Sequence, residues 1–107
     1  MSHSTAIHLA TLRVPHTHPS LPGHFPGQPI VPGVVLLDQV QQAAQQWLGG
    51  QVQLRSLQQA KFVTPLLPDQ EAQIHLKLQG AELRFSITRA AETIAQGVMH
   101  IGSGAVA

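Results

Sequence analysis

The stretch from Pro22 to Asp38 holds the residues best suited to acid–base chemistry. Its sequence, PGHFPGQPIVPGVVLLD, puts His24 in a loop and Asp38 on the helix that we expect to follow. An imidazole is largely neutral at pH 7 and can still take a proton, and a positioned carboxyl group can bind or deliver one. The two side chains are therefore a candidate base and a candidate acid.

Gly33 is a candidate site for stabilising negative charge on a reacting oxygen. Because Pro32 has no N–H, Gly33 is the first helix residue with an unpaired amide, and the helix dipole adds partial positive charge there. Its missing side chain also lets a substrate lie against the backbone. We expect Phe25, Pro32 and Val34, which stand beside these groups in the sequence, to contact the substrate.

A long, stiff loop precedes the helix. Residues 15–33 contain six prolines and three glycines, so neither a helix nor a central strand can pass through them. Loops of this length in a small domain are usually functional or disordered. The loop is therefore a suitable place for a reactive side chain.

A helix is predicted from Pro32, a good first-turn residue, to Gly49 and Gly50, which end it. The apolar stripe predicted to pack on the chain's own sheet consists of Leu36, Val40, Ala43, Ala44 and Trp47. Asp38 points away from this stripe and so needs another neighbour. Gln42 lies one turn further on the same side, where an i,i+4 side-chain hydrogen bond is natural.

Strands are predicted over the rest of the chain. They cover residues 5–14 with an irregularity, 52–62 with some interruption, 71–79, 83–88 and 94–101. Residues 71–79 alternate most clearly between apolar and polar side chains, as a half-buried strand does. We expect an antiparallel meander with the helix packed on one face of a curved sheet, which is an α+β fold.

Composition excludes several classes of protein. The chain has 107 residues, 43% hydrophobic and 10% charged, with a formal net charge of +1, which favours one globular domain over residues 1–107. No basic cluster indicates nucleic-acid binding. The absence of cysteine excludes disulfides, thiolate zinc sites and cysteine nucleophiles. No apolar run has the length of a signal peptide or a membrane span, so we expect a soluble, cytoplasmic protein.

The loop and helix start resemble the β-hydroxyacyl-acyl carrier protein dehydratases of the hot-dog fold. That family shares the pattern His-Phe-Pro-Gly-x-Pro-x-x-Pro-Gly-Val, followed five residues after its last glycine by Glu or Asp, and residues 24–38 match it. Lys61-Phe62 with Pro65 and Pro68 is similar to the family's strand entering its next turn. The resemblance implies a curved antiparallel sheet of about five strands wrapped around one central helix.

The resemblance also implies roles for individual residues. The family's catalytic histidine falls on His24, its catalytic carboxylate on Asp38, its oxyanion-binding amide on Gly33, and the glutamine that holds the carboxylate on Gln42. The implied reaction removes water from a (3R)-3-hydroxyacyl thioester, in fatty-acid or polyketide and polyene synthesis, to give a trans-2-enoyl thioester.

The implied substrate arrives on the phosphopantetheine arm of an acyl carrier protein or as a coenzyme A thioester, and no cofactor or metal is needed. In the family the active site lies between two subunits. The resemblance therefore implies a homodimer in which His24 of one chain meets Asp38 of the other.

Other interpretations of the same residues stay open. A hot-dog thioesterase shares the scaffold but attacks with water, and a non-catalytic subunit would only bind acyl groups. His16, His18 and His24 could form a metal site, although no further ligand is suggested by spacing. The prolines could form a polyproline ligand for a partner domain. The sequence departs from the family at residues 68–70, which read Pro-Asp-Gln where the family often has Pro-Gly-Asp.

Overall fold

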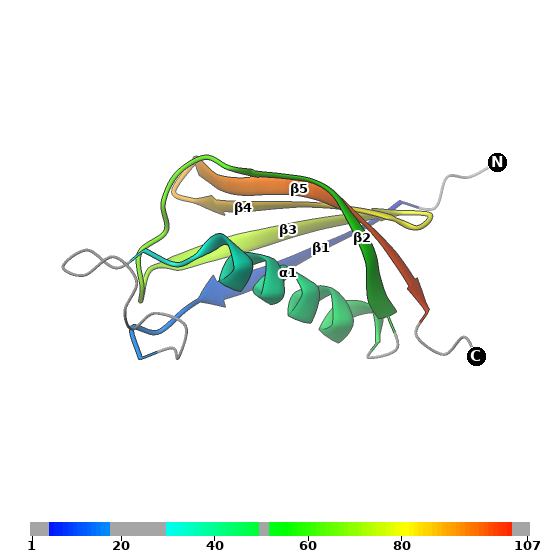
Figure 1. Cartoon of the computed structure of the whole chain (residues 1–107), viewed down its shortest axis with the longest axis horizontal. Helices are drawn as coiled ribbons and strands as arrows, with labels where there is room; N and C mark the ends of the chain where they lie inside the picture. The colour runs from blue at the N-terminus through cyan, green and yellow to red at the C-terminus, as the bar shows by residue number, and fades with distance from the viewer. Residues whose placement is uncertain (1–4, 18–29, 50–51, 104–107) are drawn as a thin grey trace.

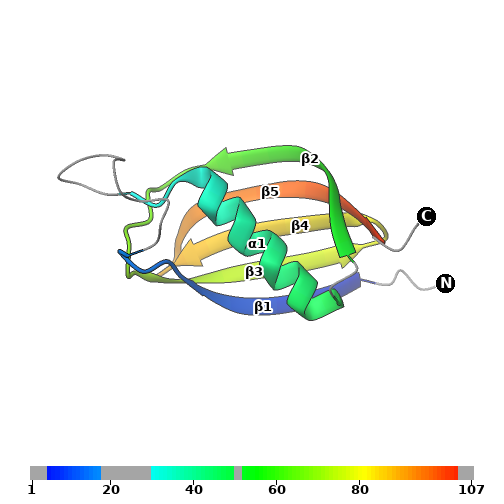
Figure 2. The same cartoon turned by 60° about the horizontal axis from the view of Figure 1, so that its bottom comes forward.

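Five antiparallel strands curve around one helix in the part of the chain that the computed structural model describes, residues 5–17, 30–49 and 52–103 (Figure 1). The elements in chain order are β1 (Thr5–Arg13), α1 (Gly33–Leu48), β2 (Val52–Phe62), β3 (Glu71–Gln79), β4 (Glu82–Arg89) and β5 (Glu92–Ser103). Figure 2 shows α1 lying diagonally across the concave face of the sheet. This arrangement confirms the predicted α+β architecture.

The core lies between α1 and the sheet. Period-two alternation in the central strands puts every second side chain against the helix, as the sequence predicts. The buried residues of β3 and β4 are Ala72, Ile74, Leu76, Leu83, Phe85 and Ile87. The predicted helix stripe is buried too, except that Trp47 is half-buried and stacks on His8 of β1, with ring centroids 5.0 Å apart.

The strand order corrects the predicted meander. The order is β1-β3-β4-β5-β2, so β3, β4 and β5 form the meander but β2 pairs with β5 at the far edge of the sheet. Residues 63–70 carry the chain from β2 at this edge to β3, on the other side of β4 and β5. The helix crosses the sheet from β2 towards β1 (Figure 2), so its two ends lie beside the two edge strands of the sheet.

The irregularity predicted in the first strand is wrong. β1 pairs with β3 in unbroken register from Thr5↔Gln79 to Arg13↔Glu71. Ile7 and Leu9 lie on the outer face, 71% and 60% exposed. The predicted irregularity assumes that the apolar residues Ile7 and Leu9 are buried, which would require the buried face to change along the strand. Leu12 on the inner face is fully buried, whereas Ile7 and Leu9 are exposed.

The helix begins one residue later than its proline suggests. Pro32 is the N-cap, with an extended backbone, and Gly33 is the first helical residue. The helix ends at Leu48 before Gly49, whose φ of 105° suits glycine alone among the common residues. Gly50 lies outside the described residues.

β2 is strongly curved (Figure 1), and its predicted interruption is confirmed. Its register with β5 shifts between Leu54 and Ser56 and again between Leu57 and Gln59. Bulges of this kind bend a strand and increase its twist. The second shift lies beside Gly97 of β5. After this shift β2 continues to its last residue, Phe62, whose ring contacts Gly33.

Candidate active site

An apolar cavity of about 530 Å³ lies at the N-terminal end of α1. It is lined by residues 30–34, Leu36, Leu37, residues 62–66 and Ile94. Thr64 contributes the one polar side chain of this lining set. A cavity of this size with an apolar lining fits a small apolar chain. Apart from Thr64, the polar groups of its lining residues belong to the backbone.

The start of the helix faces this cavity without a cap. The N-cap Pro32 makes no side-chain hydrogen bond, and no acidic residue stands in the first turn. The Pro32 carbonyl accepts from the Val35 and Leu36 amides, at 3.0 and 3.2 Å. The Gly33 amide stands before these and has no partner within the helix. Its N–H and the helix dipole can therefore act on a developing negative charge.

Phe62 packs directly over Gly33. A Cβ built on Gly33 would lie 2.8 Å from Cζ of the Phe62 ring, closer than carbon atoms pack. The ring is 52% exposed and also lines the cavity. Glycine at this position therefore lets the ring pack against the backbone, and a Cβ here would push the half-exposed ring aside.

Asp38 projects from α1 away from the sheet, as the helical pattern predicts, and its side chain is exposed. The Gln42 amide donates a hydrogen bond of 2.7 Å from Nε2 to Oδ2 of Asp38. The predicted i,i+4 contact is therefore present. Asp38 is not among the cavity-lining residues, but it lies one turn after Val34, which is.

The structure brings together only some of the predicted site residues. Pro32, Gly33 and Val34 all line the cavity. His24 and Phe25 lie outside the described residues, so the predictions for them stay predictions. The same holds for His18 of the possible metal site, and the described residues contain no group of three or more His, Cys, Asp or Glu side chains able to hold a metal ion.

Two features have no clear signal in the sequence. The first is the cavity wall formed by residues 62–66 and Ile94. The Lys61-Phe62 and Pro65 motif indicated a turn here, but it did not indicate that Phe62 contacts Gly33. The second is His16, considered above as a metal ligand, which instead contacts Asp69 at 2.9 Å. The unusual Asp at residue 69 was the available signal.

No helix within residues 5–17, 30–49 and 52–103 combines the length and apolar character needed to span a membrane.

A curved five-stranded antiparallel sheet around one helix, with an apolar cavity where that helix starts, defines a protein of the hot-dog fold. The family model of the ApeI-like proteins, described as ApeI dehydratase, matches residues 1–98. The chain therefore belongs to the ApeI-like dehydratase family. Both results confirm the fold and the family that the loop motif implies.

The chain is also similar to 3-hydroxyacyl-[acyl-carrier-protein] dehydratases named FabZ. It is 38% identical over 66 residues to the Wolbachia protein, covering 55% of this chain and 46% of that one. It is 35% identical over 78 residues to a Haemophilus influenzae protein, covering 65% and 51%. The chain thus spans about half the length of the curated relatives it matches.

Two solved structures resemble the whole chain. The dehydratase heterocomplex ApeI:P from Xenorhabdus doucetiae is matched at a TM-score of 0.72 with 26% identity, over 94% of this chain and 98% of that one. An uncharacterized protein from Erwinia carotovora subsp. atroseptica is matched at 0.77 with 27% identity, over 96% and 88%.

Proposed function

We propose that this protein eliminates water from a (3R)-3-hydroxyacyl thioester to give the trans-2-enoyl thioester. The observation that carries the proposal is the apolar cavity of about 530 Å³ that meets the uncapped helix start at Gly33. An acyl chain can occupy the cavity while its thioester oxygen accepts from the Gly33 N–H. Membership of the ApeI-like dehydratase family and the similarity to FabZ proteins support the same reaction.

The proposed mechanism needs three groups. His24 removes the proton from C2, and the electron pair of that C–H bond forms the C2–C3 double bond. The C3–O bond breaks, and a protonated Asp38 gives its proton to the departing hydroxyl, which leaves as water. The Gly33 amide stabilises the charge that builds on the thioester oxygen. The reaction is redox neutral and the chain supplies each group, so we propose that it needs no cofactor.

The proposed substrate carrier is the phosphopantetheine arm of an acyl carrier protein, with coenzyme A thioesters as simpler substitutes. The FabZ relatives are named for acyl-carrier-protein substrates. We place the reaction in the cytoplasm with the carrier protein, in the synthesis of a fatty acid or of a polyketide or polyene chain.

We further propose that the active site forms between two subunits. Asp38 is exposed on the helix face opposite the chain's own sheet. Val34, Phe62 and Val63, which line the cavity at the start of the same helix, are 74%, 52% and 56% exposed, and the edge strand β2 offers backbone groups for pairing. A second hot-dog subunit packed here would bury these side chains and bring its own His24 to Asp38.

A homodimer is the first candidate, and a heterocomplex such as ApeI:P is the second. The molar mass of the purified chain in solution separates them. A dimer that dehydrates supports the homodimer. A monomer that becomes active only with a second hot-dog subunit supports the heterocomplex.

Product analysis tests the reaction itself. We expect the protein, given a 3-hydroxyacyl thioester, to produce the ultraviolet absorbance of a conjugated enoyl thioester without releasing thiol. Release of free thiol without enoyl product would assign a thioesterase instead. Saturable binding with neither product, in the assembled protein, would assign an acyl-binding subunit.

Gln42→Ala is expected to lower kcat about fivefold, the rate equivalent of losing one hydrogen bond of roughly 1 kcal/mol that orients Asp38. Both side chains are exposed, so Tm should stay within about 2 °C of wild type. Gln46→Ala, which changes an exposed glutamine one turn later, is the control and should leave kcat unchanged. Equal rates for the two variants would remove the orienting role of Gln42.

A further inference from the structure

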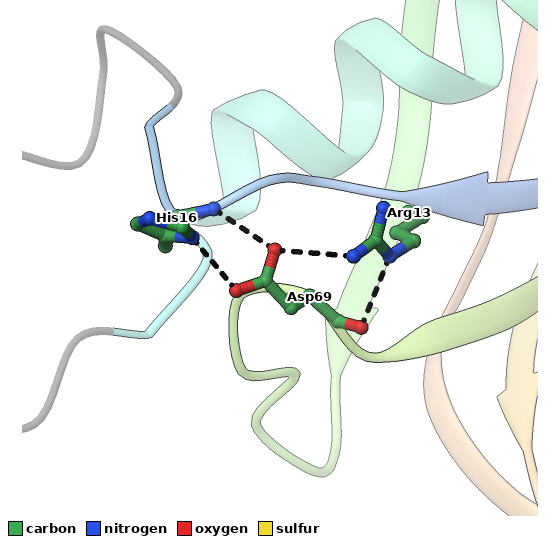
Figure 3. A network of polar contacts seen from close by, with 3 residues as sticks. All are labelled: Arg13, His16 and Asp69. Atoms are coloured by element: carbon green, nitrogen blue, oxygen red, sulfur yellow. Dashed lines mark hydrogen bonds and ion pairs between the residues drawn. The ribbon is translucent and has the colours of Figure 1, made fainter.

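Asp69 holds the end of β1 with its backbone and with both of its carboxylate oxygens (Figure 3). Its amide donates to the Val14 carbonyl at 2.8 Å, and its carbonyl accepts from Arg13 Nε at 3.2 Å. Oδ1 accepts from the His16 amide at 3.2 Å, and Oδ2 contacts His16 Nδ1 at 2.9 Å. One residue thus contacts the end of β1 at Arg13, the following Val14, and His16 at the start of the loop.

The stability of the fold does not account for this carboxylate. The side chains of Arg13, His16 and Asp69 are 59%, 72% and 41% exposed, and exposed ion pairs contribute little to folding. Asp69 also has a φ of 70°, in the left-handed region that favours glycine. Glycine would keep both backbone contacts at this φ, so what aspartate adds at this position is the set of carboxylate contacts with His16 and Arg13.

The carboxylate is held in its charged form. Partial desolvation raises the pKa of Asp69, but the hydrogen bonds and charge of His16, with a smaller effect from Arg13, lower it more. The net result is a pKa below the ordinary value of an aspartate. Asp69 therefore accepts hydrogen bonds as an anion at neutral pH, when such bonds are strongest.

The same segment of chain also holds the other end of the loop. The Leu66 carbonyl, three residues before Asp69, accepts from the Val31 amide at 2.8 Å. Residues 62–66 line the cavity as well. Residues 62–69 therefore form a wall of the cavity and also contact the chain on both sides of residues 17–30. The sequence of that stretch contains His24.

We propose that Asp69 is a positioning residue for dehydration, which acts by fixing the start of the His24 stretch relative to the cavity wall. This inference rests on the proposed function, because it assumes that His24 is the base. Securing the ends of a loop removes conformations in which its catalytic group is misplaced. Misplacement of about 1 Å can cost roughly a hundredfold in rate, so a partial loss of restraint should reduce kcat measurably.

Two substitutions at residue 69 separate the side chain from the backbone. Asp69→Gly removes the carboxylate, tolerates the positive φ and keeps both backbone contacts. Asp69→Asn keeps an acceptor for the His16 amide but loses the charge. We expect kcat to fall about tenfold in Asp69→Gly and about threefold in Asp69→Asn, with KM within twofold of wild type, because the restraint acts on geometry rather than on substrate binding.

Tm and the coupling with His16 show whether Asp69 acts as proposed. Both variants should melt within about 3 °C of wild type. His16→Ala should lower kcat like Asp69→Gly, and the two together should cost no more than either alone, because they remove one contact. If Asp69→Gly does not fold, Asp69→Asn with His16→Ala decides the question in the same way.

Glu82→Gln is the matched control. It removes a half-buried carboxylate whose Oε2 pairs with Arg84 Nε at 2.8 Å on β4, and it should leave kcat unchanged. Wild-type kcat in all residue 69 variants, or a loss of kcat with a parallel loss of Tm, would overturn the inference. Failure of the proposed function would show differently, as no enoyl product from the wild-type protein, and full activity in His24→Ala would remove the assumption that His24 is the base.

Discussion

Asp38→Asn is expected to lower kcat for dehydration between about a hundredfold and ten-thousandfold, the usual effect of removing a general acid. Asparagine keeps the shape of the side chain and can still contact Gln42, but it cannot give a proton to the leaving hydroxyl. Since Asp38 is exposed, Tm should change by less than about 2 °C. His24→Ala should cause a loss of the same order by removing the base.

A heterodimer of the two inactive chains is expected to recover about half of the wild-type activity, because in a two-fold dimer with shared sites it contains one intact pair. The chain that carries Asp38→Asn supplies a normal His24, and its partner supplies a normal Asp38. The other site of the same dimer lacks both groups. Recovery therefore measures whether the two residues come from different subunits.

Co-expression with two different affinity tags isolates this heterodimer. The measurement is its steady-state rate of enoyl formation compared with the wild type and with each variant alone. If both groups came from one chain, each chain of the heterodimer would lack one of them and the activity would stay at background. Such a result would contradict the shared site while leaving the dehydration reaction intact.

Gly97→Ala is expected to destabilise the fold by at least about 3 kcal/mol, at the upper end of what overpacking costs. A Cβ at this position would lie 2.2 Å from the Gln59 carbonyl oxygen and 2.6 Å from Cζ of Phe85. The oxygen belongs to the backbone where β2 shifts register, and Phe85 is buried, so neither group can move cheaply. Thermal unfolding should show Tm lowered by about 12 °C or more.

Gly102→Ala provides the comparison on the same strand. Its Cβ would meet the side chain of Arg55, 2.6 Å from Nε, and a long arginine side chain can rotate aside. We expect a change in Tm of less than about 4 °C, equivalent to under 1 kcal/mol. A Gly97→Ala protein that melts like Gly102→Ala would show that β2 does not depend on this close approach for its bend.

Local patterns in the sequence were enough to identify most of the elements. β3 matches its predicted bounds, and β4 and the helix match within about two residues, because alternation along a strand and periodicity along a helix depend on neighbours in the chain. The contact between Asp38 and Gln42 was predictable for the same reason, since four positions on a helix bring side chains together.

The loop motif went further than periodicity. It implied the fold and the family, which the structure and the similar proteins confirm. It could do so because a dense set of prolines and glycines around one histidine constrains the backbone and the chemistry together. The roles of His24, Gly33 and Asp38 stay predictions that the experiments above address.

Contacts between distant parts of the chain were decided only by the tertiary structure. The pairing of β2 with β5, the outward orientation of Ile7 and Leu9, and the ring of Phe62 over Gly33 have no local signal. The contact between His16 and Asp69 joins residues 53 positions apart. Such contacts depend on how the sheet curves to cover the helix, and that curvature is set by packing between all the elements at once rather than by any one segment.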